Sequence, residues 1–138
     1  MKILKYVIVD DCGKMLNPMV VDGQIVGGVA HGVGNALYEE VVFNEDGQPL
    51  TGTFMDYLLP SSHEVPNVEV GHQEFPSTLN PLGVKGVGEG GTTSAPAALA
   101  NAIVDAMEPL AIQLNEMPMT PDRVFAAIRR AKEGSAAT

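Results

Sequence analysis

Residues 82–96 read LGVKGVGEGGTTSAP, and five glycines in this stretch surround one lysine, Lys85, and one glutamate, Glu89. Glycine tolerates backbone conformations and close approaches that side chains forbid. The stretch runs into a predicted helix, and backbone N–H groups at a helix start can bind an anion. A carboxylate has no folding role in such a loop. Shielded from water, Glu89 becomes a usable general base; left in solvent, it is an ordinary loop glutamate, which is the commoner case.

Two nucleotide-binding motifs almost fit this stretch. Gly86 to Gly91 matches G-x-G-x-x-G, but that fingerprint must follow a β-strand, and residues 77–85 with Pro81 make a poor strand. Gly86 to Thr93 nearly matches the phosphate loop, but Thr92 stands where the lysine belongs. A Rossmann-type nucleotide binder is therefore the weaker alternative, and it requires a strand before Gly86.

The charge pattern singles out Lys85. It is the one Lys or Arg between Lys14 and Arg123. A lone lysine in a glycine-rich loop can be directed at an anion, or it can be exposed and incidental. Its position alone leaves both interpretations open.

Working outward from this stretch, hydrophobic periodicity predicts an α+β fold with a few strands and about three helices. Four-residue spacing of apolar side chains and Asp22, Ser94 and Thr120 as N-caps predict the helices. The predicted elements are strands at 3–11 and 67–75, helices at 22–40, 95–107 and 120–133, and a hairpin at 41–50. We expect one (sub)domain over residues 1–133 and a disordered tail over 134–138.

Beyond its first turn, the predicted helix 22–40 contains four glycines, Gly27, Gly28, Gly32 and Gly34, each of which costs about 1 kcal/mol relative to alanine. Gly28, Gly32 and Ala36 form a stripe of small residues along it. Such a stripe lets another backbone, or a flat cofactor, come close. The spacing favours backbone packing.

The 138-residue chain has 45% hydrophobic residues, enough for a core. Its net charge of −9 argues against nucleic-acid binding. The lone Cys12 excludes an internal disulfide, and the three histidines share no zinc-ligand spacing, so we expect no metal held by protein side chains alone. Asp10 and Asp11 end the first apolar run too early for a signal peptide, and no run approaches the ~18 residues of a membrane span. We expect a cytoplasmic protein.

Four stretches together resemble the C-terminal part of the molybdopterin-binding large subunit of the xanthine dehydrogenase, aldehyde oxidase and carbon monoxide dehydrogenase family. They cover nearly the whole chain except its tail. They include VDDCGKMLNP at the start of the first and KGVGEGGTTSAP within the third, and they span residues 9–40, 52–66, 80–106 and 117–128.

The resemblance implies roles for particular residues. Glu89, in the segment KGVGE, would be the catalytic base that deprotonates a water-derived ligand of molybdenum. Gln24, in the GQ pair of the glycine-rich helix, would lie near the cofactor. The loop residues expected against the molybdenum–pterin cofactor are Lys85, Gly86, Val87 and Gly88. His31 stands where many relatives carry glutamine, so no role is assigned to it.

The resemblance also implies a cofactor and partners. The cofactor is expected in its cytosine dinucleotide form, with iron–sulfur clusters and FAD on partner subunits and an aldehyde, heterocycle or carbon monoxide as substrate. Because the family's large subunit is several times longer, the rest of the site must come from other polypeptide, and we expect an oligomer. The alternative is a non-catalytic, stand-alone module that binds a partner.

Overall fold

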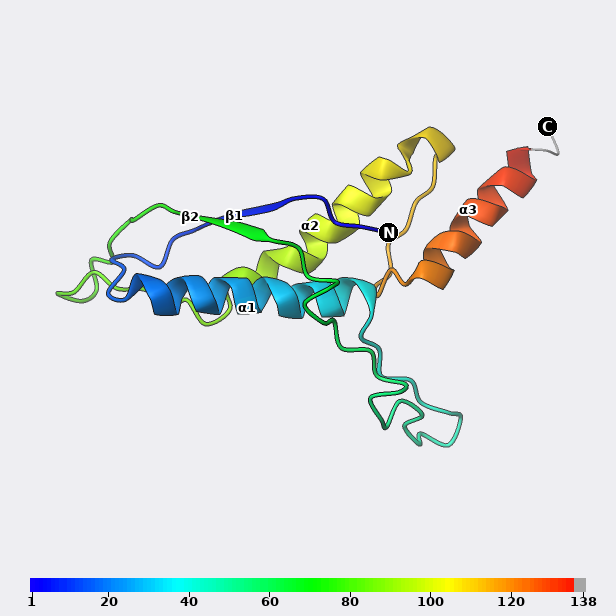
Figure 1. Cartoon of the computed structure of the whole chain (residues 1–138), viewed down its shortest axis with the longest axis horizontal. Helices are drawn as coiled ribbons and strands as arrows, with labels where there is room; N and C mark the ends of the chain where they lie inside the picture. Colours follow the sequence, from blue (N-terminus) through cyan, green and yellow to red (C-terminus); the bar gives the residue numbers. More distant parts are fainter. Residues whose placement is uncertain (136–138) are drawn as a thin grey trace. The chain divides into compact units, whose positions relative to one another are not determined.

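The computed structural model describes residues 1–135 and confirms an α+β fold (Figure 1). The described residues form two β-strands, three α-helices and one short 3₁₀ helix. In chain order these are β1 (Tyr6–Asp10), α1 (Pro18–Leu37), β2 (Val68–His72), α2 (Gly90–Ala106), η1 (Glu108–Leu110) and α3 (Pro121–Ser135). None of the helices in this part of the chain combines the length and hydrophobicity needed to cross a membrane.

The chain divides into two compact units. One unit consists of two segments of the chain, Lys2–Gly32 and Pro60–Ala95. This unit contains both strands and the glycine-rich stretch. We call it the sheet unit. Among the described residues, the other unit contains Met1, Val33–Leu59 and residues 96–135. Every candidate site residue lies in the sheet unit.

The two strands pair in parallel, with Tyr6 opposite Val68 and Asp10 opposite His72. They lie side by side in Figure 1. Parallel strands cannot be joined by a tight turn, and α1 belongs to the long connection between them. Tyr6 and Ile8 are buried, and burial raises the pKa of the Tyr6 phenol despite its hydrogen bond with Ser94.

Helix α1 begins earlier than the sequence predicts. Asn17 is the N-cap: its Oδ1 accepts the Val20 N–H at 3.3 Å, and Pro18 occupies the first helical position. Asp22 is therefore not a cap. It lies one turn inside the helix, where its Oδ1 is 2.6 Å from Nε2 of His72.

Helices α1 and α2 approach each other at two glycines within the sheet unit. A Cβ at Gly28 would lie 2.9 Å from Cα of Gly91 and 2.9 Å from the Thr92 nitrogen. A Cβ at Gly91 would lie 2.0 Å from the Ile25 carbonyl oxygen. This confirms backbone packing at Gly28. Ile25 and Val29, on either side of the contact along α1, are fully buried.

The start of α2 also differs from the predicted start at residue 95. The helix begins at Gly90, because the Glu89 carbonyl accepts the N–H groups of Thr92 and Thr93 at 3.0 and 3.1 Å. Ser94, predicted as the cap, therefore lies inside the helix, and so does Pro96. Glycines that appear from sequence to belong to a loop form its first turn.

In the other unit, the predicted hairpin at 41–50 forms a tight turn at Gly47, with φ of 77°, but only an isolated bridge between Phe43 and Pro49. Thr120 caps α3 as predicted, accepting the Arg123 N–H at 3.4 Å. Helix α3 reaches Ser135, so the first two residues of the predicted tail are helical. Residues 136–138 of that predicted tail lie outside the described residues.

Candidate functional site

The glycine-rich loop is held at its first half by the turn that follows β1. The Lys85 N–H donates to the Cys12 carbonyl at 2.8 Å, and the Lys14 N–H donates to the Gly83 carbonyl at 2.9 Å. Asn80 closes the same segment, because its side-chain amide both donates to and accepts from the backbone of Val84, at 2.9 and 3.1 Å. The loop therefore has a defined path before it reaches Gly86.

The second half of the loop is tied to α1 by Gln24. The Gln24 Nε2 donates a hydrogen bond of 2.8 Å to the Gly88 carbonyl, directly before Glu89. One residue later, the Gly90 N–H donates to the Val87 carbonyl at 3.2 Å, and α2 begins. Two elements 64 residues apart in sequence thus fix the backbone on both sides of Glu89.

The Glu89 side chain is exposed at the N-terminal end of α2. Its backbone carbonyl is engaged in the helix, and the described residues offer its carboxylate no hydrogen bond or ion pair. This is the geometry of an anchored backbone that presents a free carboxylate outward. No residue within 1–135 shields this carboxylate from water.

Lys85 already has an anionic partner, which answers the question its isolation raises. Its Nζ lies 2.5 Å from Oδ2 of Asp11. The Lys85 hydrogen bond, followed by the N–H groups of Gly13 and Phe75, lowers the pKa of the Asp11 carboxyl to about 2. The lysine therefore brings a locally neutral pair to the loop and stabilises its path, in addition to any contact with a ligand.

The loop offers an open cradle for a flat group. A Cβ built at Gly86 or Gly88 would meet no described atom within 4 Å. Neither residue has a positive φ, unlike Gly13 and Gly83. Nothing in the described chain therefore requires glycine at 86 or 88. Bare backbone at both positions fits the close approach of a planar cofactor such as a pterin.

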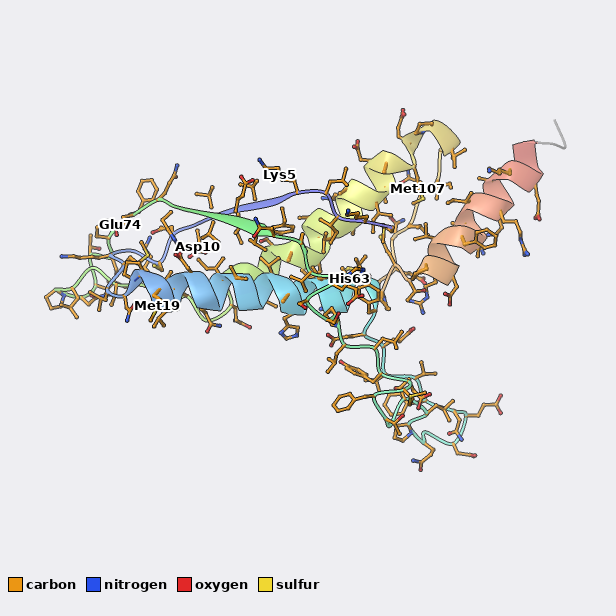
Figure 2. The ribbon with its side chains drawn as sticks, viewed as in Figure 1. Lys5, Asp10, Met19, His63, Glu74 and Met107 are labelled. Carbon is orange, nitrogen blue, oxygen red and sulfur yellow. The ribbon has the colours of Figure 1, made fainter. Side chains whose placement is uncertain are left out.

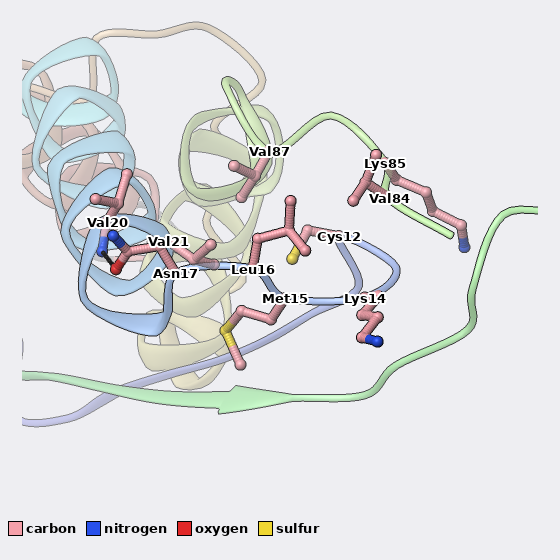
Figure 3. A pocket seen from close by; sticks show the side chains of 10 residues that line it. All are labelled: Cys12, Lys14, Met15, Leu16, Asn17, Val20, Val21, Val84, Lys85 and Val87. Atoms are coloured by element: carbon pink, nitrogen blue, oxygen red, sulfur yellow. Dashed lines mark hydrogen bonds between the residues drawn. The ribbon is translucent and has the colours of Figure 1, made fainter. Parts of the chain in front are cut away.

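Beside this cradle is a mostly apolar pocket of about 250 Å³, lined by the turn after β1, the start of α1 and the loop (Figure 3). Val20, Val21 and Val87 form its apolar side, and in Figure 3 the amino groups of Lys14 and Lys85 lie away from them. Ligand sites commonly occupy about 300–1,000 Å³ and bury most of their ligand. At about 250 Å³ and open to solvent, this pocket lies below that range and does not enclose a ligand by itself.

Sequence reasoning missed three members of this neighbourhood. Asp11 is not predicted as the partner of Lys85, nor Asp22 as the partner of His72. Asp10, labelled in Figure 2, has its Oδ1 only 2.7 Å from the position of a Cβ on Gly90, and its Oδ2 is buried without a partner among the described residues. The adjacent acids DD at 10–11 are the only sequence signal. No cluster of metal ligands occurs within residues 1–135.

Comparison with known proteins places the chain in a family. Residues 1–66 match the model of the molybdopterin cofactor-binding domain. The chain is 43% identical over 128 residues to the nicotine 6-hydroxylase large subunit of Paenarthrobacter nicotinovorans, covering 93% of this chain and 16% of that protein. It is 35% identical over 128 residues to the carbon monoxide dehydrogenase large chain of Hydrogenophaga pseudoflava, with the same coverage of both.

Solved structures agree. The chain resembles quinoline 2-oxidoreductase from Pseudomonas putida 86 with a TM-score of 0.90 and 44% identity, over 93% of this chain and 16% of that one. It resembles the Cu,Mo-CO dehydrogenase with a TM-score of 0.90 and 32% identity, over 95% and 16%. The chain thus spans about one sixth of the length of these relatives. It belongs to the family of molybdopterin-binding large subunits of the xanthine dehydrogenase and carbon monoxide dehydrogenase type, and it corresponds to a portion of such a subunit.

Proposed function

We propose that this chain supplies the catalytic base, Glu89, and one wall of the molybdenum–pterin site in a molybdenum hydroxylase whose remaining walls come from other polypeptide. The observation that carries the proposal is the tether from Gln24 to Gly88, which fixes the backbone beside an otherwise free carboxylate. A solvated loop glutamate needs no such anchoring.

The residues of this chain would divide the work as follows. The backbone from Gly86 to Gly88, bare at its two glycines, would lie against the pterin together with Val87. Gln24 would hold the Gly88 carbonyl and thereby the position of Glu89. Lys85, paired with Asp11, would hold the first half of the loop against the cofactor.

When bound, the molybdenum–pterin cofactor supplies the two-electron oxidation of the substrate. Glu89 accepts the proton that a water-derived oxygen loses as it becomes nucleophilic, on one of its carboxylate oxygens. General-base assistance of this kind contributes about 10²–10⁴-fold in rate. Its exposure in this chain means that the complementing polypeptide must close over the carboxylate and exclude bulk water.

The family membership supports further proposals about the assembly. We propose the cytosine dinucleotide form of the cofactor, with iron–sulfur clusters and FAD on partner subunits of a cytoplasmic oligomer. The substrate class is an aldehyde, an electron-poor heterocycle or carbon monoxide. The relatives named for nicotine, quinoline and carbon monoxide show how far substrates vary among proteins similar to this one.

A segment replacement tests the proposal. This chain would replace the matching portion of the nicotine 6-hydroxylase large subunit, coexpressed with that enzyme's partner subunits, and the unaltered enzyme would be the control. We expect the chimera to retain molybdenum and to hydroxylate nicotine. A folded chimera that loads no molybdenum would contradict the proposal and favour the non-catalytic partner-binding module.

A further inference from the structure

The free edge of strand β1 carries an inference about assembly. A parallel sheet of two strands is unusual, because parallel sheets normally have both faces covered and more strands. Here β1 exposes Val7 and Val9 on the face opposite Tyr6 and Ile8, with exposed fractions of 55% and 60%. Leu4, just before the strand, is 87% exposed. One face of this edge strand is therefore apolar and open to water.

The register shows which backbone groups of β1 are available. In a parallel pair, a residue bonded to the neighbouring strand directs both its N–H and its C=O to that strand, and its two neighbours direct theirs to the opposite edge. The Asp10 carbonyl accepts the Gln73 N–H at 3.0 Å. Asp10, Ile8 and Tyr6 therefore face β2, and the N–H and C=O groups of Val7 and Val9 point to the free edge.

This edge lacks most of the features that keep natural sheet edges from pairing. Proteins protect edges with proline, bulges or unpaired charges. Residues 4–9 contain no proline, and the lysine among them, Lys5, forms an ion pair of 3.1 Å with Glu69 on the neighbouring strand. In Figure 2 the Lys5 side chain points away from α1. An apolar edge with unused backbone groups is suited to accept another strand.

We propose that a β-strand from the remainder of the large subunit adds to the free edge of β1 and extends the sheet. The occupant follows from coverage: relatives carry about six times the length of this chain, so most of a large subunit is available to pack against it. The added strand would bond to the N–H and C=O groups of Val7 and Val9. This proposal concerns the assembly of the site, and it rests on the proposed function only in requiring a complementing polypeptide.

The experiment is residue-resolved amide hydrogen exchange. The isolated chain would be compared with its complex with the rest of the nicotine 6-hydroxylase large subunit. In the isolated chain, the Ile8 amide exchanges slowly while those of Val7 and Val9 exchange fast. In the complex, all three exchange slowly. Fast exchange of Val7 and Val9 in the complex, or no association, would overturn the proposal. Because this measurement does not depend on molybdenum or turnover, a failure of the proposal can be distinguished from a failure of the proposed function.

A pair of substitutions gives a second measurement. Val9→Pro removes an N–H that β2 does not use, and proline is tolerated where the N–H faces outward. Loss of one bond with an unsatisfied partner weakens association by about tenfold or more. Val9→Thr keeps the N–H and the branched shape, and it should bind within about threefold of the parent. Equal binding by both variants would overturn the proposal. If Val9→Pro fails to fold, as judged by circular dichroism, the exchange pattern of the parent decides.

Discussion

Two adjacent glycines of α1 should respond in opposite directions to the same substitution. Gly27 is exposed, and a Cβ there meets no described atom within 4 Å. A Cβ at Gly28 would lie 2.9 Å from the Gly91 Cα and the Thr92 nitrogen, both backbone atoms of α2. Backbone atoms cannot rotate away, so α1 and α2 would have to separate locally. The Thr92 hydroxyl, which donates to the Gly28 carbonyl at 3.3 Å, would move with them.

The magnitudes follow from these distances. Alanine in a helix interior stabilises by about 1 kcal/mol relative to glycine, so Gly27→Ala should raise the free energy of unfolding by about that amount. Gly28→Ala has the same gain, but overpacking costs about 1–3 kcal/mol, which leaves a net loss of about 0–2 kcal/mol. The two variants should therefore differ by about 2 kcal/mol.

Urea denaturation of the isolated chain at low concentration measures this difference. With an m-value of about 2 kcal/mol/M, the two unfolding midpoints should lie about 1 M apart. Gly27→Ala is the matched control, since it changes the same helix by the same methyl group. If Gly28→Ala stabilises as much as Gly27→Ala, the close approach of α1 and α2 is refuted.

Three further outcomes are expected. NMR titration should give the Asp11 carboxyl a pKa of about 2, and Lys85→Met should raise this pKa towards the usual ~3.9; a pKa near 4 in the parent would contradict the pairing. Because the folded-state pKa is depressed, the pairing stabilises the fold above about pH 4, and this stabilisation is lost as the pH falls towards 2. Gln24→Leu should speed exchange of the Gly90 amide, which donates to the Val87 carbonyl, without lowering helix content, whereas unchanged exchange would remove the tether from the account. The isolated chain should retain no molybdenum by metal analysis, because it supplies one wall of the site; stoichiometric metal with pterin would show the opposite.

Local signals predicted the elements whose ends are set locally. Thr120 followed by Pro121 is an N-cap followed by a favoured first helical residue, and α3 begins there. The same signal stands at Asn17 and Pro18, but an Asn-Pro pair also marks turns, so the sequence favours Asp22 as the start of α1, whereas Asn17 caps the helix. The Asn17-Pro18 pair is compatible with either a turn or a helix start, and only the packing of the folded chain distinguishes the two.

Tertiary contacts explain the remaining differences. The first turn of α2 is glycine-rich and has weak helix propensity, yet it is helical where Gly91 packs on the Ile25 carbonyl of α1. Lys85 and Asp11 are 74 residues apart, and no spacing rule connects them. The resemblance implies that Gln24 lies near the cofactor. Its hydrogen bond to Gly88, which supports the loop, joins residues 64 positions apart, and no sequence pattern indicates it.

The central claim is that Glu89 is a base held in place by its loop, and Glu89→Gln tests it most directly. The variant would be made in the nicotine 6-hydroxylase chimera, with Glu45→Gln, at an exposed turn of the other unit, as control. Molybdenum content and the single-turnover rate of enzyme reduction by nicotine would be measured together. We expect Glu89→Gln to retain molybdenum and lose at least about 10²-fold in rate, while Glu45→Gln matches the parent. A Glu89→Gln rate within a few-fold of the parent at full molybdenum content would contradict the claim.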